Sequence, residues 1–219
     1  MKRSLLPTSS PPGALLLLSS VVLLSTGCGL RRVPLDVLDK LPYEAKIELL
    51  EAENDLALAV DRLDEARAEV ARARDQIRRG RDRYSAARDE VSAAADENSK
   101  EVAELAVIEA DKRVEWLRAK QRLNVREEDL AEQNLTCAQA RYEVSRLTAA
   151  RKAKLEGSET LDPEKFEAQL KGCEEDYAAL KEKAKEVGAE AETMRADWDS
   201  ARAALAKKTF DARASPFVE

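Results

Sequence analysis

The sequence predicts an all-α fold, a long antiparallel three-helix bundle or coiled coil with up-down-up topology. Glycine and proline contribute only seven residues each to the 219-residue chain, and charged residues make up 37% of it. No proline occurs between Tyr43 and Asp162. Apolar residues recur in this region at intervals of seven, which is the repeat of helices that pack along their length.

Residues 1–27 are predicted to be a signal peptide that does not belong to the fold. Lys2 and Arg3 give a basic start, and an apolar stretch from Gly13 to Leu24 follows. As a helix this stretch would be about 18 Å long, whereas the hydrocarbon core of a bilayer is about 30 Å thick. A transmembrane helix is the alternative interpretation and fits the length less well.

The end of this stretch, Leu24-Ser25-Thr26-Gly27-Cys28-Gly29, resembles the lipobox of bacterial lipoproteins. It departs from the usual pattern at Ser25, where a large aliphatic residue is common. The resemblance implies that Cys28 becomes a lipid-modified N-terminus carrying palmitate-type acyl chains. It also implies that Gly29, which is not aspartate, directs the protein to the outer membrane, facing the periplasm. The alternative is an ordinary signal peptide followed by an incidental cysteine.

The cysteine count agrees with this resemblance. The chain has three cysteines, and exported proteins rarely keep an unpaired thiol. If Cys28 carries lipid, Cys137 and Cys173 remain as a pair. We expect a disulfide between them because both occupy seam positions of their helices. Two buried free thiols or an intermolecular bridge are the alternatives.

Residues 28–42 are predicted to be a short, semi-extended tether, and the first helix is predicted over 43–96. The helix alternates a large residue with alanine or glycine three positions later, which lets a second helix approach closely. The large series is Leu49, Leu56, Leu63, Val70, Ile77, Tyr84 and Val91, and the small series is Ala52, Ala59, Ala66, Ala73, Gly80, Ala87 and Ala94.

The second helix is predicted over 99–156, between the other two. Its apolar face is wider than a single seam, which indicates two neighbours. The heptad of the first helix ends after Ala94, and Asn98 followed by Glu101 is typical of a helix start, so we expect a tight turn there. One unbroken helix over 43–156, with its partner in another copy of the chain, is the alternative.

The third helix is predicted over 163–214, with Asp162 as its N-cap and Pro163 as its first residue. Its apolar residues again recur every seven positions. Residues 216–219 form a short tail, which is either a docking peptide or a frayed terminus.

Pairing the helices antiparallel about their turns places Gly80, Trp116 and Trp198 in one core layer. Gly80 is the only glycine of the small series, so the smallest residue of the first helix is expected to face the bulkiest residue of the second, as close packing requires. The alternative is that Gly80 merely softens the helix.

The composition argues against an enzyme. The chain has no histidine, which removes catalytic triads, cysteine–histidine dyads and imidazole-bound metal sites. It has no CxxC motif, glycine-rich phosphate loop or cluster of metal ligands, so we expect no catalytic residues, no metal and no cofactor. The net charge of −6 argues against nucleic-acid binding.

Six arginines within twelve residues of the first helix are a candidate patch for an anionic partner, such as a cell-wall polymer or another protein. They are Arg72, Arg74, Arg78, Arg79, Arg81 and Arg83. The alternative is that these side chains pair with acidic residues of the neighbouring helices.

Together these features predict a non-enzymatic envelope lipoprotein, anchored to the membrane through Cys28 and acting as a coiled-coil spacer or scaffold. The alternative is an accessory or adaptor component of an efflux or secretion assembly in the periplasm, because long antiparallel hairpins resemble those of envelope tunnel proteins and their adaptors. We expect a protein or cell-wall partner. A homo-oligomer is an alternative to the monomer, because a heptad serves partners in the same chain or in another equally well.

Overall fold

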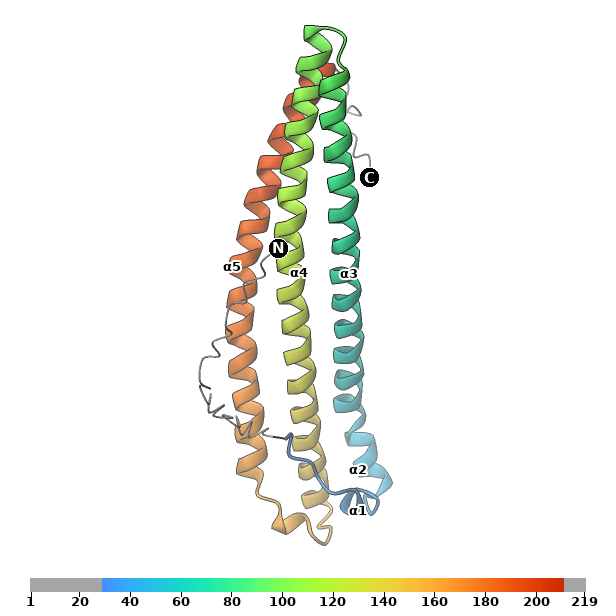
Figure 1. Cartoon of the computed structure of the whole chain (residues 1–219). Coiled ribbons are helices and arrows are strands. Elements are labelled where there is room, and N and C mark those ends of the chain that lie inside the picture. The colour runs from blue at the N-terminus through green and yellow to red at the C-terminus, as the bar shows by residue number, and fades with distance from the viewer. Residues whose placement is uncertain (1–28, 211–219) are drawn as a thin grey trace, which may run out of the picture.

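Three long helices, with two short ones at one end, make up the fold. The computed structural model describes residues 29–210 (Figure 1). In chain order the elements are α1 (Leu35–Leu38), α2 (Tyr43–Glu48), α3 (Leu50–Ala93), α4 (Glu97–Lys152), the 3₁₀ turn η1 (Ser158–Thr160) and α5 (Pro163–Thr209). The described residues contain no strand, and the predicted helical bundle with up-down-up topology is confirmed.

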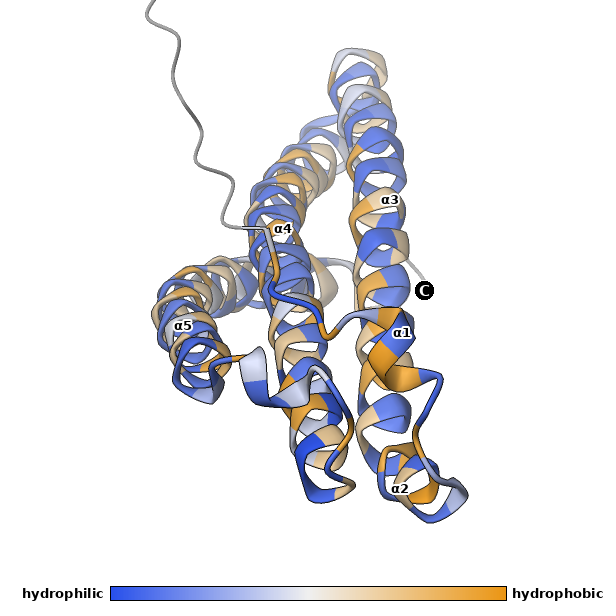
Figure 2. Cartoon of the chain, turned by 90° about the horizontal axis from the view of Figure 1, so that it is seen from below, coloured by the Kyte–Doolittle hydropathy of each residue, from blue (hydrophilic) through white to orange (hydrophobic). Residues whose placement is uncertain are grey.

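Helix α4 is the centre of the molecule. Helices α3 and α5 run antiparallel to it, one on either side, and each packs along it (Figure 1). Within the described range, α3 and α5 share no comparable interface with each other. The three helices therefore form an open layer, which Figure 2 shows from below with α4 between its neighbours. At a rise of about 1.5 Å per residue, the 56 residues of α4 span about 84 Å.

The tip of this rod is the turn between α3 and α4. The Asp96 carboxylate accepts a hydrogen bond from the Ser99 amide at 2.7 Å, and the Asp96 amide donates to Ser99 Oγ at 3.1 Å. This reciprocal capping starts α4 at Glu97, so the unbroken helix over 43–156 is excluded. The predicted cap at Asn98 is wrong by two residues, because Asp96 has the carboxylate that reaches the free amide.

The base of the rod holds the connection from α4 to α5. Helix α4 ends at Lys152, four residues before the predicted end, because Lys154 and Gly157 take positive φ angles of 51° and 90° and turn the chain. Helix α5 starts at Pro163 as predicted, capped by Asp162. It ends at Thr209, followed by Phe210 in the left-handed region, whereas the predicted helix ran to 214.

The same base holds a compact apolar core, which corrects the predicted tether. Residues 28–42 were expected to be semi-extended, but the described part of this segment folds onto the bundle. Pro34 and Pro42 precede α1 and α2 as N-cap residues, and the apolar residues between them turn inward. The buried core is Val33, Val37, Leu38, Leu41, Ala45, Leu49, Leu147, Ala149, Ala150 and Phe166.

The seams of the rod follow the two heptad series of α3. Both series contribute to the buried face, in which alanine and glycine alternate with larger residues: Ala59, Leu63, Val70, Ala73, Ile77, Gly80 and Ala87. On α5 the buried residues are Phe166, Cys173, Ala184, Ala191, Trp198 and Leu205. Helix α4 meets both partners, and this explains its wide apolar face.

Candidate functional site: a groove across three helices

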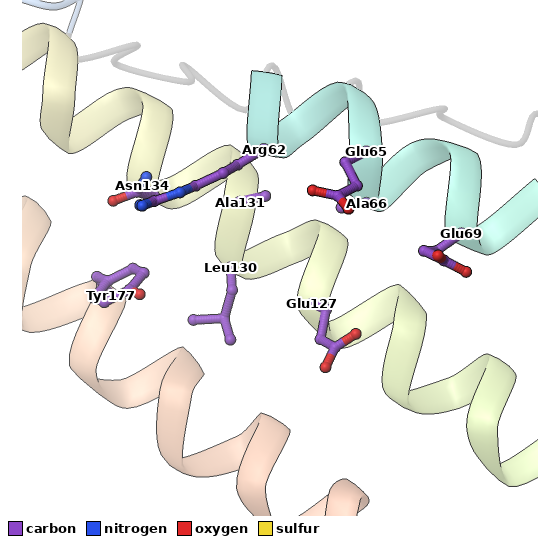
Figure 3. A pocket seen from close by; sticks show the side chains of 9 residues that line it. All are labelled: Arg62, Glu65, Ala66, Glu69, Glu127, Leu130, Ala131, Asn134 and Tyr177. Carbon is purple, nitrogen blue, oxygen red and sulfur yellow. The ribbon is translucent and has the colours of Figure 1, made fainter. Parts of the chain in front are cut away.

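A groove of about 360 Å³ crosses the middle of the open layer, where α3 and α5 approach each other over α4 without meeting (Figure 3). Its floor consists mainly of small and apolar side chains, and its rim is polar. The lining residues are Arg62, Glu65, Ala66 and Glu69 from α3, Glu127, Leu130, Ala131 and Asn134 from α4, and Tyr177 from α5. The groove follows from the heptad of α3, because alanine at the seam leaves space beside α4.

The two ends of the groove differ in charge. Figure 3 shows the Arg62 side chain extending toward Asn134 at one end, with Glu65, Glu69 and Glu127 toward the other. The groove therefore has a cationic end and an anionic end.

The carboxylates at the anionic end have pKa values shifted in opposite directions. A 2.6 Å hydrogen bond from Arg72 lowers the pKa of Glu69, and the Arg72 and Lys120 charges lower it further. Partial burial raises the pKa of Glu127, and the negative charge of Glu69 adds to this effect. Lys120 acts against it. Opposite shifts are common at acid–base sites, but Glu69 is held by Arg72, and the groove lining includes no serine, cysteine or lysine nucleophile.

Metal ligands are not gathered at this groove either. Across residues 29–210, no group of three or more acidic or cysteine side chains lies in an arrangement that could hold a metal ion.

The predicted core layer brings two of its three residues together. Trp116 of α4 and Trp198 of α5 stack with ring centroids 4.9 Å apart. Gly80 is buried, but a Cβ atom there would lie 3.2 Å from side-chain atoms of both Val114 and Leu117. The prediction that Gly80 faces Trp116 is wrong, because one residue along a helix is a rotation of about 100° and Trp116 lies on the side of α4 that meets α5.

The two cysteines beyond Cys28 are joined in the structure. Cys137 of α4 and Cys173 of α5 form a disulfide with Cα atoms 5.5 Å apart. The amide of Gln133 donates to the Cys173 carbonyl at 3.3 Å, one turn away along α4. The disulfide therefore lies within the α4–α5 seam, nearer the base of the rod than the tip.

The six clustered arginines between Arg72 and Arg83 of α3 form no ion pair with a described residue of the neighbouring helices. Arg72 contacts Glu69 at 2.6 Å and Arg78 contacts Asp75 at 3.0 Å, both within α3. The other four, Arg74, Arg79, Arg81 and Arg83, form no ion pair with any described carboxylate. Residues two apart on a helix differ by about 200° in direction. Arg72 and Arg79 therefore lie on one flank of α3, and Arg74 and Arg81 lie on the other.

Two buried glutamates were not anticipated from the sequence. Glu109 accepts a 2.7 Å hydrogen bond from the indole of Trp198, and Glu143 accepts one of 2.8 Å from the Val33 amide. Both occupy interior positions of α4, whose other glutamates are exposed or half-buried. Each holds α4 to another element.

Several predicted features lie outside the described residues. These are the signal peptide 1–27, the lipid-attachment residue Cys28 and the tail 216–219. None of the described helices combines the length and the apolar character that a membrane crossing requires.

Comparison with known proteins does not assign this chain to a family. No protein-family model, curated protein or solved structure matches this chain.

Proposed function

We propose that this protein is a non-enzymatic lipoprotein of the cell envelope, in which acyl chains on Cys28 hold a rigid helical rod at the outer membrane, facing the periplasm. The rod acts as a spacer or scaffold for a protein or cell-wall partner. The lipobox-like sequence supports the anchor, and the position of the first described residues supports the orientation.

The observation that carries this proposal is the attachment of residues 31–33 to the base of the rod. The Arg31 amide donates to Gln169 Oε1 at 3.0 Å, and the Val33 amide donates to Glu143 Oε2 at 2.8 Å. Cys28 is three residues before Arg31, so an acyl chain on it would hold the base, not the tip, against the membrane. From the level of Gln169 to the end of α5 is about 60 Å.

The anchor is tested by intact mass and fractionation of the full chain expressed in a diderm bacterium. We expect a diacyl or triacyl mass and a membrane-bound protein, and we expect Cys28→Ser to lose both. The matched control is the double variant Cys137→Ser and Cys173→Ser, which removes the other two cysteines and should still be acylated. An unmodified Cys28 in the membrane fraction would refute the anchor.

The spacer role is tested by energy transfer from a dye on the rod to a dye in the bilayer. A donor at Glu156 reports on the base, and a donor at Ala95 reports on the tip; both side chains are exposed. We expect strong transfer from the base and weak transfer from the tip. Equal transfer from both would mean that the rod lies flat, which is incompatible with a spacer.

A second candidate function is the adaptor role in an efflux or secretion assembly. The groove between α3 and α5 supports it, because an open layer leaves a surface parallel to the helices where a helix of another protein fits. A photo-crosslinker at Asn134, which lines the groove, should capture a helical component of such an assembly. The same group at Thr136, which does not line the groove, should not.

A further inference from the structure

The exposed large apolar side chains of this protein gather at the base of the rod. Within residues 29–210, six of the nine lie between residues 35 and 60, and the remaining three are spread over α4 and the end of α5. Four of the six lie on α1, α2 and the first residue of α3: Leu35, Tyr43, Ile47 and Leu50. These four residues are called the basal apolar face here.

The segment from Tyr43 to Leu50 is apolar on two opposite sides. Ala45 and Leu49 point into the core of the base. Tyr43, Ile47 and Leu50 follow at intervals of four and three residues, which places them together on the other side of the helix, and they are 74%, 48% and 51% exposed. An apolar side of a helix that faces away from the core is a candidate contact surface. Figure 2, seen from below, shows hydrophobic segments on α1 and α2 at the base of the rod.

We propose that the basal apolar face rests in the interfacial layer of a lipid bilayer and sets the rod upright on the membrane. This inference rests on the proposed function in one respect, which is that Cys28 carries the lipid. Val33 is five positions after Cys28, and an extended chain of this length spans at most about 18 Å. The Val33 amide is hydrogen-bonded to Glu143. Acyl chains on Cys28 would therefore hold Val33, and with it the base of the rod, within about this distance of the bilayer.

The chemistry of the face suits a lipid surface. Tyr43 combines a ring with a hydroxyl group, as the aromatic residues of membrane interfaces do. Residues 29–50 contain four basic and four acidic residues, so this segment is neutral although the chain carries a net charge of −6. Apolar burial and not attraction to anionic lipid headgroups therefore drives the contact, and its strength should depend little on salt.

The test uses the full protein, isolated with its anchor and reconstituted into phosphatidylcholine vesicles with or without brominated acyl chains, which quench indole fluorescence. Ile47→Trp places an indole on the basal apolar face. Ile108→Trp is the matched control, because Ile108 is 51% exposed and lies on α4, toward the tip of the rod. The emission of Trp116 and Trp198, measured in the unaltered protein, is subtracted.

We expect the added indole of Ile47→Trp to lose most of its emission in brominated vesicles, at low and at high salt, and that of Ile108→Trp to lose none. Equal quenching of both, or quenching of neither, would overturn the inference. A blue shift of Ile47→Trp without quenching, which disappears on dilution, would assign the face to a second copy of the chain and would also overturn it. If Ile47→Trp fails to fold, as judged by circular dichroism, Leu50→Trp replaces it.

The acyl mass of the same sample reports separately on the proposed function. Quenching of Ile47→Trp in a chain without acyl groups would support the basal apolar face and refute the lipid anchor. Acylated protein without quenching would support the anchor and refute the face.

Discussion

Trp116 and Trp198 stack nearly parallel, with an angle of 6° between their ring planes, and they hold α4 against α5 from opposite sides of one seam. Cations surround the pair: Arg113 and Arg202 lie 5.1 and 5.7 Å from the centre of the Trp198 ring, and Lys120 lies 5.6 Å from that of Trp116. Such contacts add to the apolar burial of the rings. The two tryptophans differ, however, because only Trp198 is fully buried.

This difference predicts unequal costs for the same substitution. Trp198→Phe keeps an aromatic ring but removes the indole donor to the buried Glu109, so we expect a loss of about 1 to 3 kcal/mol in the free energy of unfolding. Trp116→Phe, at a half-buried position, should cost less than half as much. Urea denaturation of both variants measures the difference, and equal losses would contradict the role assigned to Glu109.

The two glycines Gly80 and Gly172 should respond in opposite ways to added side chains. Gly172 has no atom within 4 Å of a Cβ position, so Gly172→Ala should stabilise the protein by about 0.5 to 1 kcal/mol through helix propensity. At Gly80 the crowding by Val114 and Leu117 should cancel that gain, and Gly80→Leu should cost about 1 to 3 kcal/mol. Thermal unfolding compares Gly172→Ala, Gly80→Ala and Gly80→Leu. A stabilised Gly80→Leu would mean that α3 and α4 are farther apart than described.

Loss of the Cys137–Cys173 disulfide should reduce stability considerably. The bond closes a loop with a sequence separation of 36, for which the chain-entropy model gives about 4 kcal/mol. We expect the double serine variant, and the reduced wild-type protein, to unfold at correspondingly lower urea concentrations. Non-reducing electrophoresis is the check on the pairing, because a disulfide-linked dimer would show that the bridge joins two chains.

The groove carboxylates should give opposite dependences of stability on pH. The pKa of Glu127 is raised by folding, so its ionised form opposes folding at neutral pH, and Glu127→Gln should stabilise the protein there. This gain should disappear as the pH falls below the ordinary value of 4.5.

The pKa of Glu69 is lowered, so Glu69→Gln should destabilise at neutral pH, and this loss should disappear as the pH falls from 4.5 through the lowered pKa. Both effects should stay below about 1 kcal/mol, because water reaches these side chains. Unfolding curves at several pH values measure them, and two effects of the same sign would contradict the assignment.

Removal of the Glu143 carboxylate should release the segment that crosses the base. Glu143→Ala leaves the Val33 amide without its acceptor, and we expect faster hydrogen exchange at Val33 together with a loss of about 1 to 3 kcal/mol. Glu174→Ala, which removes an exposed ion pair with Arg141, should cost less than about 1 kcal/mol. Unchanged exchange at Val33 in Glu143→Ala would show that other contacts hold the segment.

The seven-residue pattern was sufficient to predict the three long helices, their order and their approximate register. It predicted that Gly80 lies opposite residue 116, and the structure has Val114 and Leu117 on either side of that position. The predicted level of residue 116 along the axis of α4 is therefore correct, and the predicted direction in which its side chain points around that axis is wrong. A wide apolar face does not reveal which of two neighbours receives each residue, so the predicted layer placed Trp116 against both Gly80 and Trp198, whereas it stacks only on Trp198.

The structure at the base of the rod was harder to predict than the three long helices. The segment around Val37 and Leu38 is too short for a periodic pattern, and Pro34 and Pro42 suggested an extended chain. Its burial depends on partners more than 100 residues away in sequence, such as Leu147 and Phe166. The groove was likewise absent from the sequence argument, because it exists only where α3 and α5 fail to meet.

The central position of α4 also determines how the rod would respond to a pulling force. Since α5 packs along α4 and makes no comparable interface with α3, a load on its C-terminal end would peel it away one turn at a time, starting at the tip. The α3–α4 hairpin would stay intact meanwhile. Peeling would stop at Cys173, where a covalent bond replaces packing. A partner that pulls on the end of α5 could thus detach about 54 Å of this helix from α4 before the disulfide at Cys173 resisted the force.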